Sequence, residues 1–208
     1  MDGACRNCRR EGIKLFLKGE KCFTPKCPVS RRAYPPGLHG PKGVGKMTEY
    51  GTQLREKQKA KRIYGIRERQ FKNYVDRALA RTGNTAEHLL RSLEQRLDSV
   101  VWRAGFTASH RQARQLVGHG HFLVNGEKAN VPSMLVAAGD RITLHDASEL
   151  DNVQNVIAAT LVAKQQYKAP AWLVVNPDER SITVLRSPEA TEIEQSFNSK
   201  LIIEFYSR

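Results

Sequence analysis

The sequence has 208 residues and a mass of 23.5 kDa, enough for one compact domain or two small ones. Apolar residues make up 40% of it, which supports a folded core and argues against wholesale disorder. Residues 1–83 contain 21 basic and 7 acidic side chains (net +14), whereas residues 84–208 contain 13 and 14 (net −1). Such a basic segment predicts a polyanionic partner and argues against a protein that mainly handles a neutral small molecule.

The polyanion is expected to be nucleic acid rather than a membrane face. No apolar stretch for a secretory signal is present near Met1, and the longest weakly polar run, Val153–Ala163, is too short to span a bilayer. The most basic stretch, Arg55–Arg69, lacks the line of Trp, Phe and Leu side chains that a membrane-surface helix needs. We therefore expect a cytosolic protein with no membrane partner. No dimerisation heptad is evident, so no homo-oligomer is expected.

All four cysteines lie between Cys5 and Cys27, with two residues separating Cys5 from Cys8 and four separating Cys22 from Cys27. Two short knuckles of this kind can bring four thiolates onto one metal ion. Zinc is the expected metal, although a four-thiolate iron–sulfur cluster would use the same ligands. Two disulfides do not suit a cytosolic protein, and inert free thiols are the remaining alternative. Nothing beyond the cysteines indicates an open coordination position, so we expect a structural site.

Basic side chains surround the cysteines and continue through a Pro- and Gly-rich stretch, Tyr34–Gly45, that breaks regular structure. We predict that this arm contacts RNA. Its candidate contacts are Arg6, Arg9, Arg10, Lys21, Lys26, Arg31, Arg32, Tyr34, His39, Lys42 and Lys46.

A helix is predicted next, capped by Thr48 and ending near Tyr64 before Gly65. Its cations share neighbouring faces, and only Glu56 lies among them, so phosphate contact is favoured over an ordinary solvated face. The predicted contacts on this helix are Arg55, Lys57, Lys59, Lys61 and Arg62.

A second helix is predicted over Arg67–Ala80, with an apolar face that is assigned to the core. That face consists of Phe71, Tyr74, Val75 and Leu79, and the candidate phosphate contacts at the start of the helix are Arg67, Arg69 and Lys72. A third helix is predicted from Thr85 to Gly105, because its apolar residues keep a helical period.

The next segment predicts a small module. Ser109 and Gln112 form a capping box for a helix that ends near Gly118. Phe122–Val124, the Asn125-Gly126 turn and Glu127-Lys128 predict a hairpin, and Arg141–His145 a further strand. Arg111, Arg114 and Gln115 lie on the polar face of the helix. Towards the end of the chain, a helix is predicted over Leu150–Gln165 and strands over Ser181–Leu185 and Leu201–Tyr206.

At this point the sequence resembles a known family. The stretch RLDSVVWRAGFTASHRQARQLVGHGHFLVNGEKANVPSMLVAAGDRI (Arg96–Ile142) is similar to the S4 RNA-binding domain. CRNC with CFTPKC, YPPGLHG, YGTQLREKQKAKRIYG, NTAEHLLRSLEQRLD and LIIEFYSR resemble the bacterial-type small-subunit ribosomal protein S4 family over essentially the whole chain. The chain departs from that pattern at Leu38, where Gln is usual, and matches more loosely over residues 150–200.

The resemblance implies a structural constituent of the cytoplasmic small ribosomal subunit and a primary binder of its RNA, at a helix junction in the 5′ domain. It implies that the protein nucleates assembly of the subunit body and contacts the neighbouring ribosomal proteins S5 and S3. A position near the messenger RNA entry channel, with an influence on decoding accuracy, is also implied. Carried over by position, the four cysteines match the metal-binding form of the family. The RNA-facing residues implied in the S4 domain are Arg96, Arg103, Ser109, Arg111, Arg114, Gln115, His119, Asn125 and Lys128.

These observations predict an α+β fold in which a zinc knuckle and a helical domain come first. A small helix–helix–β-hairpin S4 domain is then inserted before a C-terminal helix and strands. The expected domains are the knuckle and arm (1–45), the helical domain (46–95, completed by 147–208), the S4 domain (96–146) and the C-terminal helix and strands (147–208).

Two other classes of protein share some of these features. An RNA-modifying or tRNA-charging enzyme would need a catalytic domain beside the S4 domain, and the remaining residues show no nucleotide-binding loop or nucleophile motif, so no enzyme is expected. A zinc-dependent DNA-binding regulator would be expected to dimerise and to prefer duplex DNA.

Overall fold

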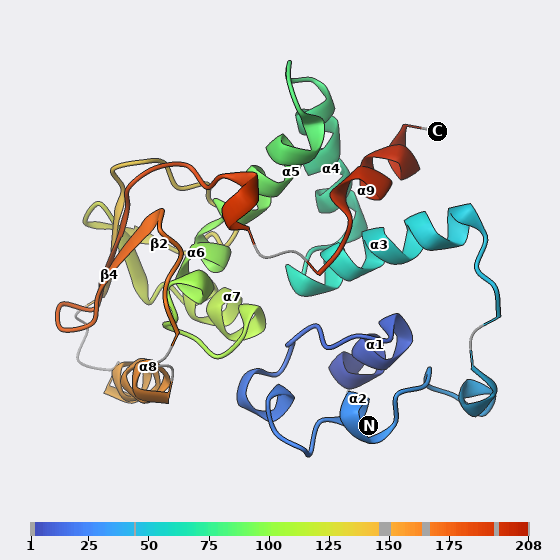
Figure 1. Cartoon of the computed structure of the whole chain (residues 1–208). Helices are drawn as coiled ribbons and strands as arrows, with labels where there is room; N and C mark the ends of the chain where they lie inside the picture. Colours follow the sequence, from blue (N-terminus) through green and yellow to red (C-terminus); the bar gives the residue numbers. More distant parts are fainter. Residues whose placement is uncertain (1–2, 44, 146–150, 164–166, 194–195, 208) are drawn as a thin grey trace. The chain divides into compact units, whose positions relative to one another are not determined.

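The computed structural model describes residues 3–43, 45–145, 151–163, 167–193 and 196–207 (Figure 1). The chain divides into two compact units, one formed by Met1–Leu89 with Gln195–Arg208 and the other by Leu90–Glu194. The segment 147–208, predicted as one C-terminal region, is therefore shared between the two units. No helix in the described ranges is long and apolar enough to cross a membrane.

The first unit is built from helices. Its elements are α1 (Gly3–Glu11), the 3-10 turn η1 (Gly19–Cys22), α2 (Pro28–Arg31), the 3-10 turn η2 (Gly40–Lys42), α3 (Glu49–Ile63), α4 (Glu68–Leu79), the start of α5 (Thr85–Glu94), and α9 (Ser199–Tyr206). The predicted cap of α3 is confirmed, because the Thr48 hydroxyl accepts a hydrogen bond from the Gly51 amide at 3.1 Å. Gly65, with φ of +62°, ends that helix in a conformation that favours glycine.

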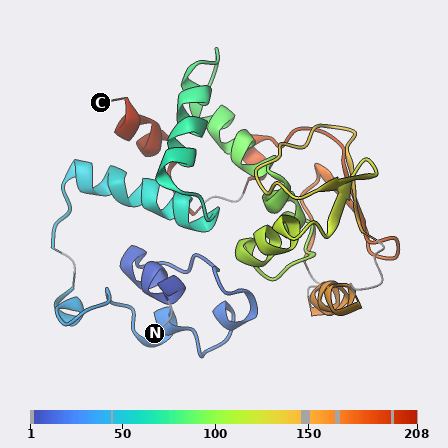
Figure 2. The same ribbon diagram turned by 180° about the vertical axis from the view of Figure 1, so that it is seen from behind.

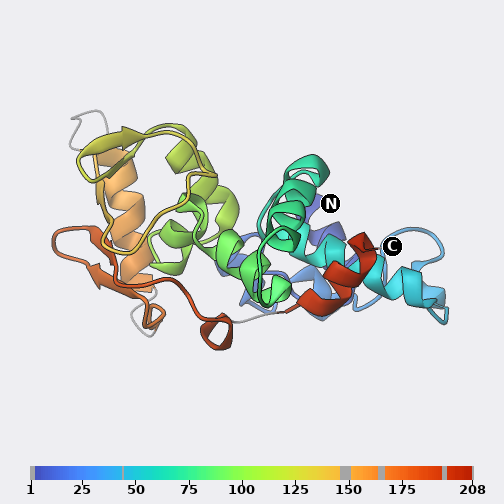
Figure 3. The ribbon, with the colours of Figure 1, turned by 90° about the horizontal axis from the view of Figure 1, so that it is seen from above.

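The core of this unit joins α4 and α9 to α3. Phe71, Tyr74 and Val75 of α4 are buried, as predicted, whereas Leu79, at the end of the same predicted apolar face, is exposed. Helix α9 lies along α3 (Figure 3), and Ile202 on α9 is fully buried. Burying these apolar faces supplies most of the driving force that holds the three helices together.

The predicted strand Leu201–Tyr206 is wrong, because these residues form helix α9. Asn198 caps the helix, its side-chain oxygen accepting hydrogen bonds from the Lys200 and Leu201 amides at 3.0 and 3.4 Å. A short apolar run fits a strand and a buried helix equally well, and here the cap and the packing on α3 decide.

The second unit contains an antiparallel sheet covered by helices. Its elements are the end of α5, α6 (Leu97–Arg103), α7 (His110–Gly118), β1 (Phe122–Val124), β2 (Glu127–Ala129), β3 (Arg141–Leu144), α8 (Asp151–Ala163), β4 (Leu173–Asn176), β5 (Ser181–Val184) and the 3-10 turn η4 (Ala190–Glu192). The strand order is β2-β1-β3-β5-β4. Its core joins Val101 of α6, Val117 of α7 and Ile157 of α8 to Phe122 and Ile182 of the sheet. Figure 2 shows the ribbon of this unit from behind, with its helices beside the sheet.

The predicted hairpin is confirmed. Leu123 pairs with Lys128, and Asn125 and Gly126 have φ of +53° and +87°, as a tight two-residue turn requires. The predicted helix 109–118 and strands 141–145 and 181–185 are also present. The predicted helix 150–165 is present over Asp151–Ala163, and residues 150 and 164–165 lie outside the described ranges. Helix α1 and strand β4 were not predicted.

The single helix predicted from Thr85 to Gly105 is wrong, because it is broken into α5 and α6. Arg96 lies between them in an extended conformation and forms a β-bridge with Leu135. The amides of Leu97 and Asp98 donate to the carbonyls of Met134 and Pro132, at 2.8 and 3.2 Å, instead of to the preceding turn. The apolar period does not show this break, since Leu93 and Leu97 are buried on both sides of it.

Candidate nucleic-acid interface and cysteine pocket

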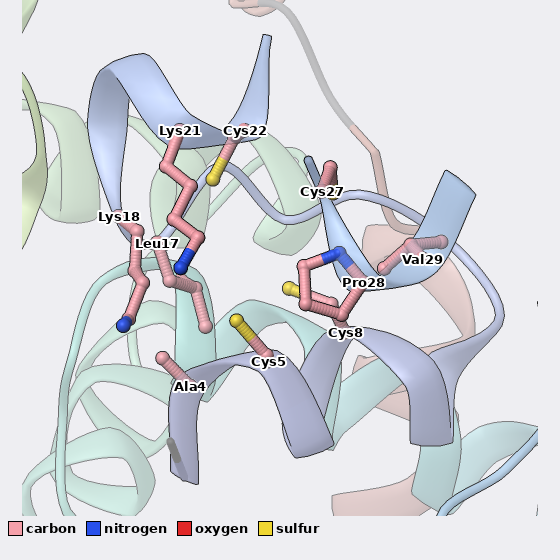
Figure 4. Close-up of a pocket in the computed structure, with 10 residues that line it drawn as sticks. All are labelled: Ala4, Cys5, Cys8, Leu17, Lys18, Lys21, Cys22, Cys27, Pro28 and Val29. Atoms are coloured by element: carbon pink, nitrogen blue, oxygen red, sulfur yellow. The ribbon is translucent and has the colours of Figure 1, made fainter. Parts of the chain in front are cut away.

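The four cysteines line one pocket of the first unit (Figure 4). Helix α1 contributes Cys5 and Cys8, which lie three residues apart and therefore face the same side. Cys22 ends η1 and Cys27 precedes α2. The sulphurs of Cys5 and Cys22 point towards each other from opposite sides of the pocket. The cysteines, predicted from spacing alone, are thus brought together by the fold.

The cysteine side chains of the pocket are buried, and their surroundings disfavour the thiolate form of Cys8 and Cys22. All four thiols are reduced and buried. Burial raises the pKa of Cys8 and Cys22, and the neighbouring cysteines raise both further. Four thiolates would repel one another here unless a cation were held between them. In the described part of the chain, however, no three His, Cys, Asp or Glu side chains are grouped as ligands of one metal ion.

Arg9 has an internal role in this structure. Its buried guanidinium donates hydrogen bonds to the carbonyl oxygens of Arg32, Tyr34 and Pro35, at 3.1, 2.9 and 3.2 Å. It also lies 4.7 Å from the centre of the Tyr34 ring. Arg9 therefore ties the Pro- and Gly-rich arm to α1. Gly40 packs so tightly on the Pro35 carbonyl that a side chain there would clash.

Most of the other residues of the first 46 that were predicted to contact RNA are exposed. Exposed side chains belong to Arg6, Arg10, Lys21, Lys26, Arg31, Arg32, His39, Lys42 and Lys46. At the start of α4, Arg67, Arg69 and Lys72 are exposed as well. These exposed groups can face a polyanion.

The cations of α3 are partly neutralised within the protein. Arg55 and Arg62 both bond to the buried carboxylate of Glu11 on α1. Lys57 and Lys61 donate to Glu68 at 2.8 and 2.7 Å. The remaining cation, Lys59, pairs with Glu56.

The sequence interpretation missed these partners because it looked for acidic residues only within the helix. Glu11 and Glu68 come from α1 and the start of α4, and a search for acidic residues elsewhere in the basic segment would have singled them out. Five cations share these three carboxylates, and α3 also carries Glu49 in its first turn, so a net charge of only +1 remains on this surface.

Glu68 is the most strongly perturbed acid of this surface. Burial acts to raise its pKa, but hydrogen bonds from Lys57, Lys61 and Tyr206 outweigh burial and lower the pKa to about 2. Lys57 itself is buried and lies 4.3 Å from the centre of the Phe205 ring. Lys57 therefore joins α3, α4 and α9 and does not point freely outwards.

In the S4 domain, Arg96 and Arg103 are not at the surface, which corrects the expectation that they face RNA. Both are buried in ion pairs. Arg96 donates to Asp98 at 2.9 and 2.5 Å, and Arg103 donates two bonds of 2.8 Å to Glu94. The two arginine side chains point into the protein because the carboxylates of Asp98 and Glu94 bind them there. These two arginines stabilise the helix pair α5–α6.

Several other residues that were predicted to face RNA lie on the polar face and at the end of α7. Arg111, Gln115 and His119 are exposed and Arg114 is half-buried. Ser109, which was predicted to face RNA, is instead buried and caps the helix, accepting from the Gln112 amide at 3.4 Å. Burial lowers the pKa of His121, with His119 and Lys128 acting in the same direction.

The hairpin turn supports this face. The Asn125 side chain is exposed and bonds to Asp140 and to the Arg141 amide, at 2.8 and 2.9 Å, which fixes the turn. Lys128 is exposed and passes over Gly120, where an added side chain would clash with it. The structure thus places Arg111, Arg114 and Lys128 on a small rigid module.

An S4-type module together with a helical unit that exposes many cations defines an RNA-binding protein. The family model "Ribosomal protein S4/S9 N-terminal domain" matches residues 2–94, and the model "S4 domain" matches residues 95–142. The chain belongs to the small ribosomal subunit protein uS4 family.

Curated relatives cover nearly the whole chain. The chain is 51% identical to the small ribosomal subunit protein uS4 of Syntrophomonas wolfei, over all of this chain and 98% of that protein. It is 50% identical to the protein of the same name from Thermodesulfovibrio yellowstonii and 48% identical to that from Thermotoga petrophila, each over 98% of this chain and 96% of the relative.

Proposed function

We propose that this protein is a structural constituent of the small ribosomal subunit and binds ribosomal RNA in the cytoplasm. The observation that supports this most directly is membership of the uS4 family along the whole chain, combined with exposed cations on the arm and on α7. It has no enzymatic role.

The chemistry of binding follows from the surface. Folded RNA is recognised through its shape, phosphates and 2′-hydroxyls, because side chains cannot read its deep major groove. Exposed arginines such as Arg10, Arg31 and Arg111 can each bind two phosphate oxygens at once. Arg9 fixes the backbone next to Arg31, and Glu11 ties α1, which carries Arg10, to α3. Arg111 lies on α7, which Ser109 caps.

The test is titration of the full chain with a fragment of the 5′ domain of small-subunit ribosomal RNA. We expect a steep salt dependence, about 0.7–0.9 log units in affinity per neutralised phosphate for each tenfold change in salt. A slope near zero would contradict this mode of binding. Preference for duplex DNA over the RNA fragment would favour a DNA-binding regulator instead.

We also propose that Cys5, Cys8, Cys22 and Cys27 hold a structural zinc ion. Their shared pocket, their burial and the lysines at its edge, Lys18 and Lys21, support the proposal. Zinc takes four thiolates in a closed tetrahedral site, and the nearby lysines would offset the remaining negative charge. Bound metal would supply much of the folding free energy of this small segment.

Metal analysis of the purified chain tests this proposal, with Cys22→Ser as the variant. We expect about one zinc per chain and the loss of that zinc in the variant. Iron and sulfide with visible absorbance would indicate an iron–sulfur cluster, and an absence of metal from active protein would reject both metal sites.

The family further supports proposals about partners. We propose that the protein binds early at the 5′ domain junction, nucleates assembly of the subunit body, and contacts ribosomal proteins S5 and S3 near the messenger entry channel. Its influence on decoding accuracy would act through these contacts. Ordered reconstitution of the subunit tests this: omission of the chain should prevent stable addition of later proteins, and normal assembly without it would contradict the proposal.

A further inference from the structure

Two phenylalanine rings lie exposed beside the cysteine pocket. The rings of Phe16 and Phe23 are stacked, with 5.0 Å between their centres and 28° between their planes. Phe16 is 40% exposed and Phe23 72% exposed. Neither ring contributes to a core, although phenylalanine is among the residues most often buried.

The backbone holds Phe16 in this outward position. Its φ is +51°, a left-handed conformation that bulky residues rarely adopt. The flanking residues explain the turn: Leu15 is buried, and Leu17 lines the pocket with Cys5 and Cys8. Residue 16 must therefore point outwards. Glycine would satisfy this turn without strain, so the aromatic side chain calls for an explanation outside the fold.

Phe23 completes the pair from a second rigid element. It directly follows Cys22 at the end of η1, and its amide donates to the Glu20 carbonyl at 3.0 Å. Both rings are thus attached to residues that line the cysteine pocket. An aromatic surface held this rigidly loses little conformational entropy when a ligand binds to it.

The charge of the segment that carries the two rings indicates the ligand class. Between residues 13 and 27 there are four lysines and one acidic residue, Glu20. The four are Lys14, Lys18, Lys21 and Lys26. Aromatic rings surrounded by cations are the arrangement with which proteins bind single-stranded nucleic acid, because a base stacks on the ring while cations hold its phosphates.

We infer that Phe16 and Phe23 form a stacking platform for an unpaired base of ribosomal RNA. This inference rests on the proposed function and adds to it a contact that is not electrostatic. Stacking needs no ion release, so its loss lowers affinity without changing the salt slope, whereas loss of a phosphate contact lowers both.

The test uses the full chain, the 5′ domain RNA fragment and the variants Phe23→Leu and Phe23→Trp. Phe23→Leu keeps an apolar side chain but removes the ring, and we expect about a 5- to 150-fold loss of affinity with an unchanged salt slope. Phe23→Trp keeps a stacking surface and should bind at least as tightly as the wild type, with its added tryptophan fluorescence quenched by RNA. Lys26→Gln, which removes an exposed cation that does not line the cysteine pocket, should instead lower both the affinity and the slope.

Tyr50→Leu is the matched control. The Tyr50 ring is 54% exposed and lies 5.5 Å from the ring of Phe205, but residues 46–53 contain only one lysine and one glutamate. We expect its RNA affinity to remain that of the wild type. Equal losses in Tyr50→Leu and Phe23→Leu would overturn the assignment of a specific platform.

The outcomes distinguish a failure of the stacking platform from a failure of the proposed RNA-binding function. If the wild type binds and Phe23→Leu binds equally well, the platform is rejected and the function stands. If Phe23→Leu binds RNA normally but fails to enter reconstituted subunits, the rings contact a protein, and the inference is again rejected. Failure of the wild type itself to bind RNA would count against the proposed function.

Discussion

Arginines of the S4 domain illustrate how one residue type takes two roles a few residues apart. Arg103 donates two hydrogen bonds to the buried carboxylate of Glu94, whereas Arg111, on the next helix, is exposed. A buried charge stabilises a fold only while its partner is present, because an unpaired buried ion is costly. An exposed arginine contributes little to stability and remains available to a phosphate.

The two arginines should therefore give opposite results when replaced. Arg103→Gln removes the cation that is paired with the buried Glu94 carboxylate, and we expect a loss of about 3–5 kcal/mol in the free energy of unfolding. Arg111→Gln should change stability by less than about 0.5 kcal/mol and weaken RNA binding. Urea unfolding and RNA titration of both variants measure this. An Arg103→Gln protein of wild-type stability would contradict the role assigned to the ion pair.

Glu68 gives the protein a defined acid sensitivity. Its folded-state pKa of about 2 lies below the ordinary value of a glutamate, so the stability that its carboxylate contributes is fully present above about pH 4.5. That contribution is lost as the pH falls from about 4.5 to 2. The difference in urea midpoint between wild type and Glu68→Gln should shrink across this window. A difference that stays constant from pH 5 to pH 2.5 would show that the pairing with Lys57, Lys61 and Tyr206 does not form.

Helix α9 shows how a short element depends on its cap. The Asn198 side chain satisfies two amides at its start, and the helix then packs Ile202 into the core of the first unit. Asn198→Ala should lower the free energy of unfolding by about 1 kcal/mol. Asn198→Ser, which can still accept a hydrogen bond, should stay close to wild type. Equal losses in both variants, measured by thermal unfolding, would contradict the capping role.

Elements whose limits are set locally could be predicted from the sequence. The cap at Thr48, the N-cap at Ser109 and the Asn125-Gly126 turn each depend on neighbouring residues, and these three are confirmed. The other half of the predicted capping box is not confirmed, because the Gln112 side chain accepts from the Ala108 amide at 2.9 Å. The break at Arg96 and the helical form of α9 depend on distant segments, which no local pattern reveals. The same limit explains the site: the cysteines were found by spacing, but the partners of Arg96 and Arg103 and those of the α3 cations were not.

The whole chain concentrates its positive charge in the first 83 residues, yet much of that charge serves the fold. Glu11, Glu56 and Glu68 take up part of it on α3, and Arg9 organises the arm. The cations of the arm, of the start of α4 and of α7 that are exposed are the ones that we propose contact RNA. Net charge therefore overstates the contribution of α3 and understates that of the nearly neutral S4 domain.

The most direct measurement is a competition experiment in which labelled 5′ domain RNA, bound to the full chain, is challenged with unlabelled RNA or duplex DNA at several salt concentrations. We predict that the RNA fragment displaces the label at far lower concentration than duplex DNA at every salt concentration. We also predict that affinity falls steeply with salt, and that Arg111→Gln reduces the salt slope by about one phosphate contact. Equal competition by duplex DNA, or an affinity independent of salt, would contradict the assignment of this protein as a ribosomal RNA binder.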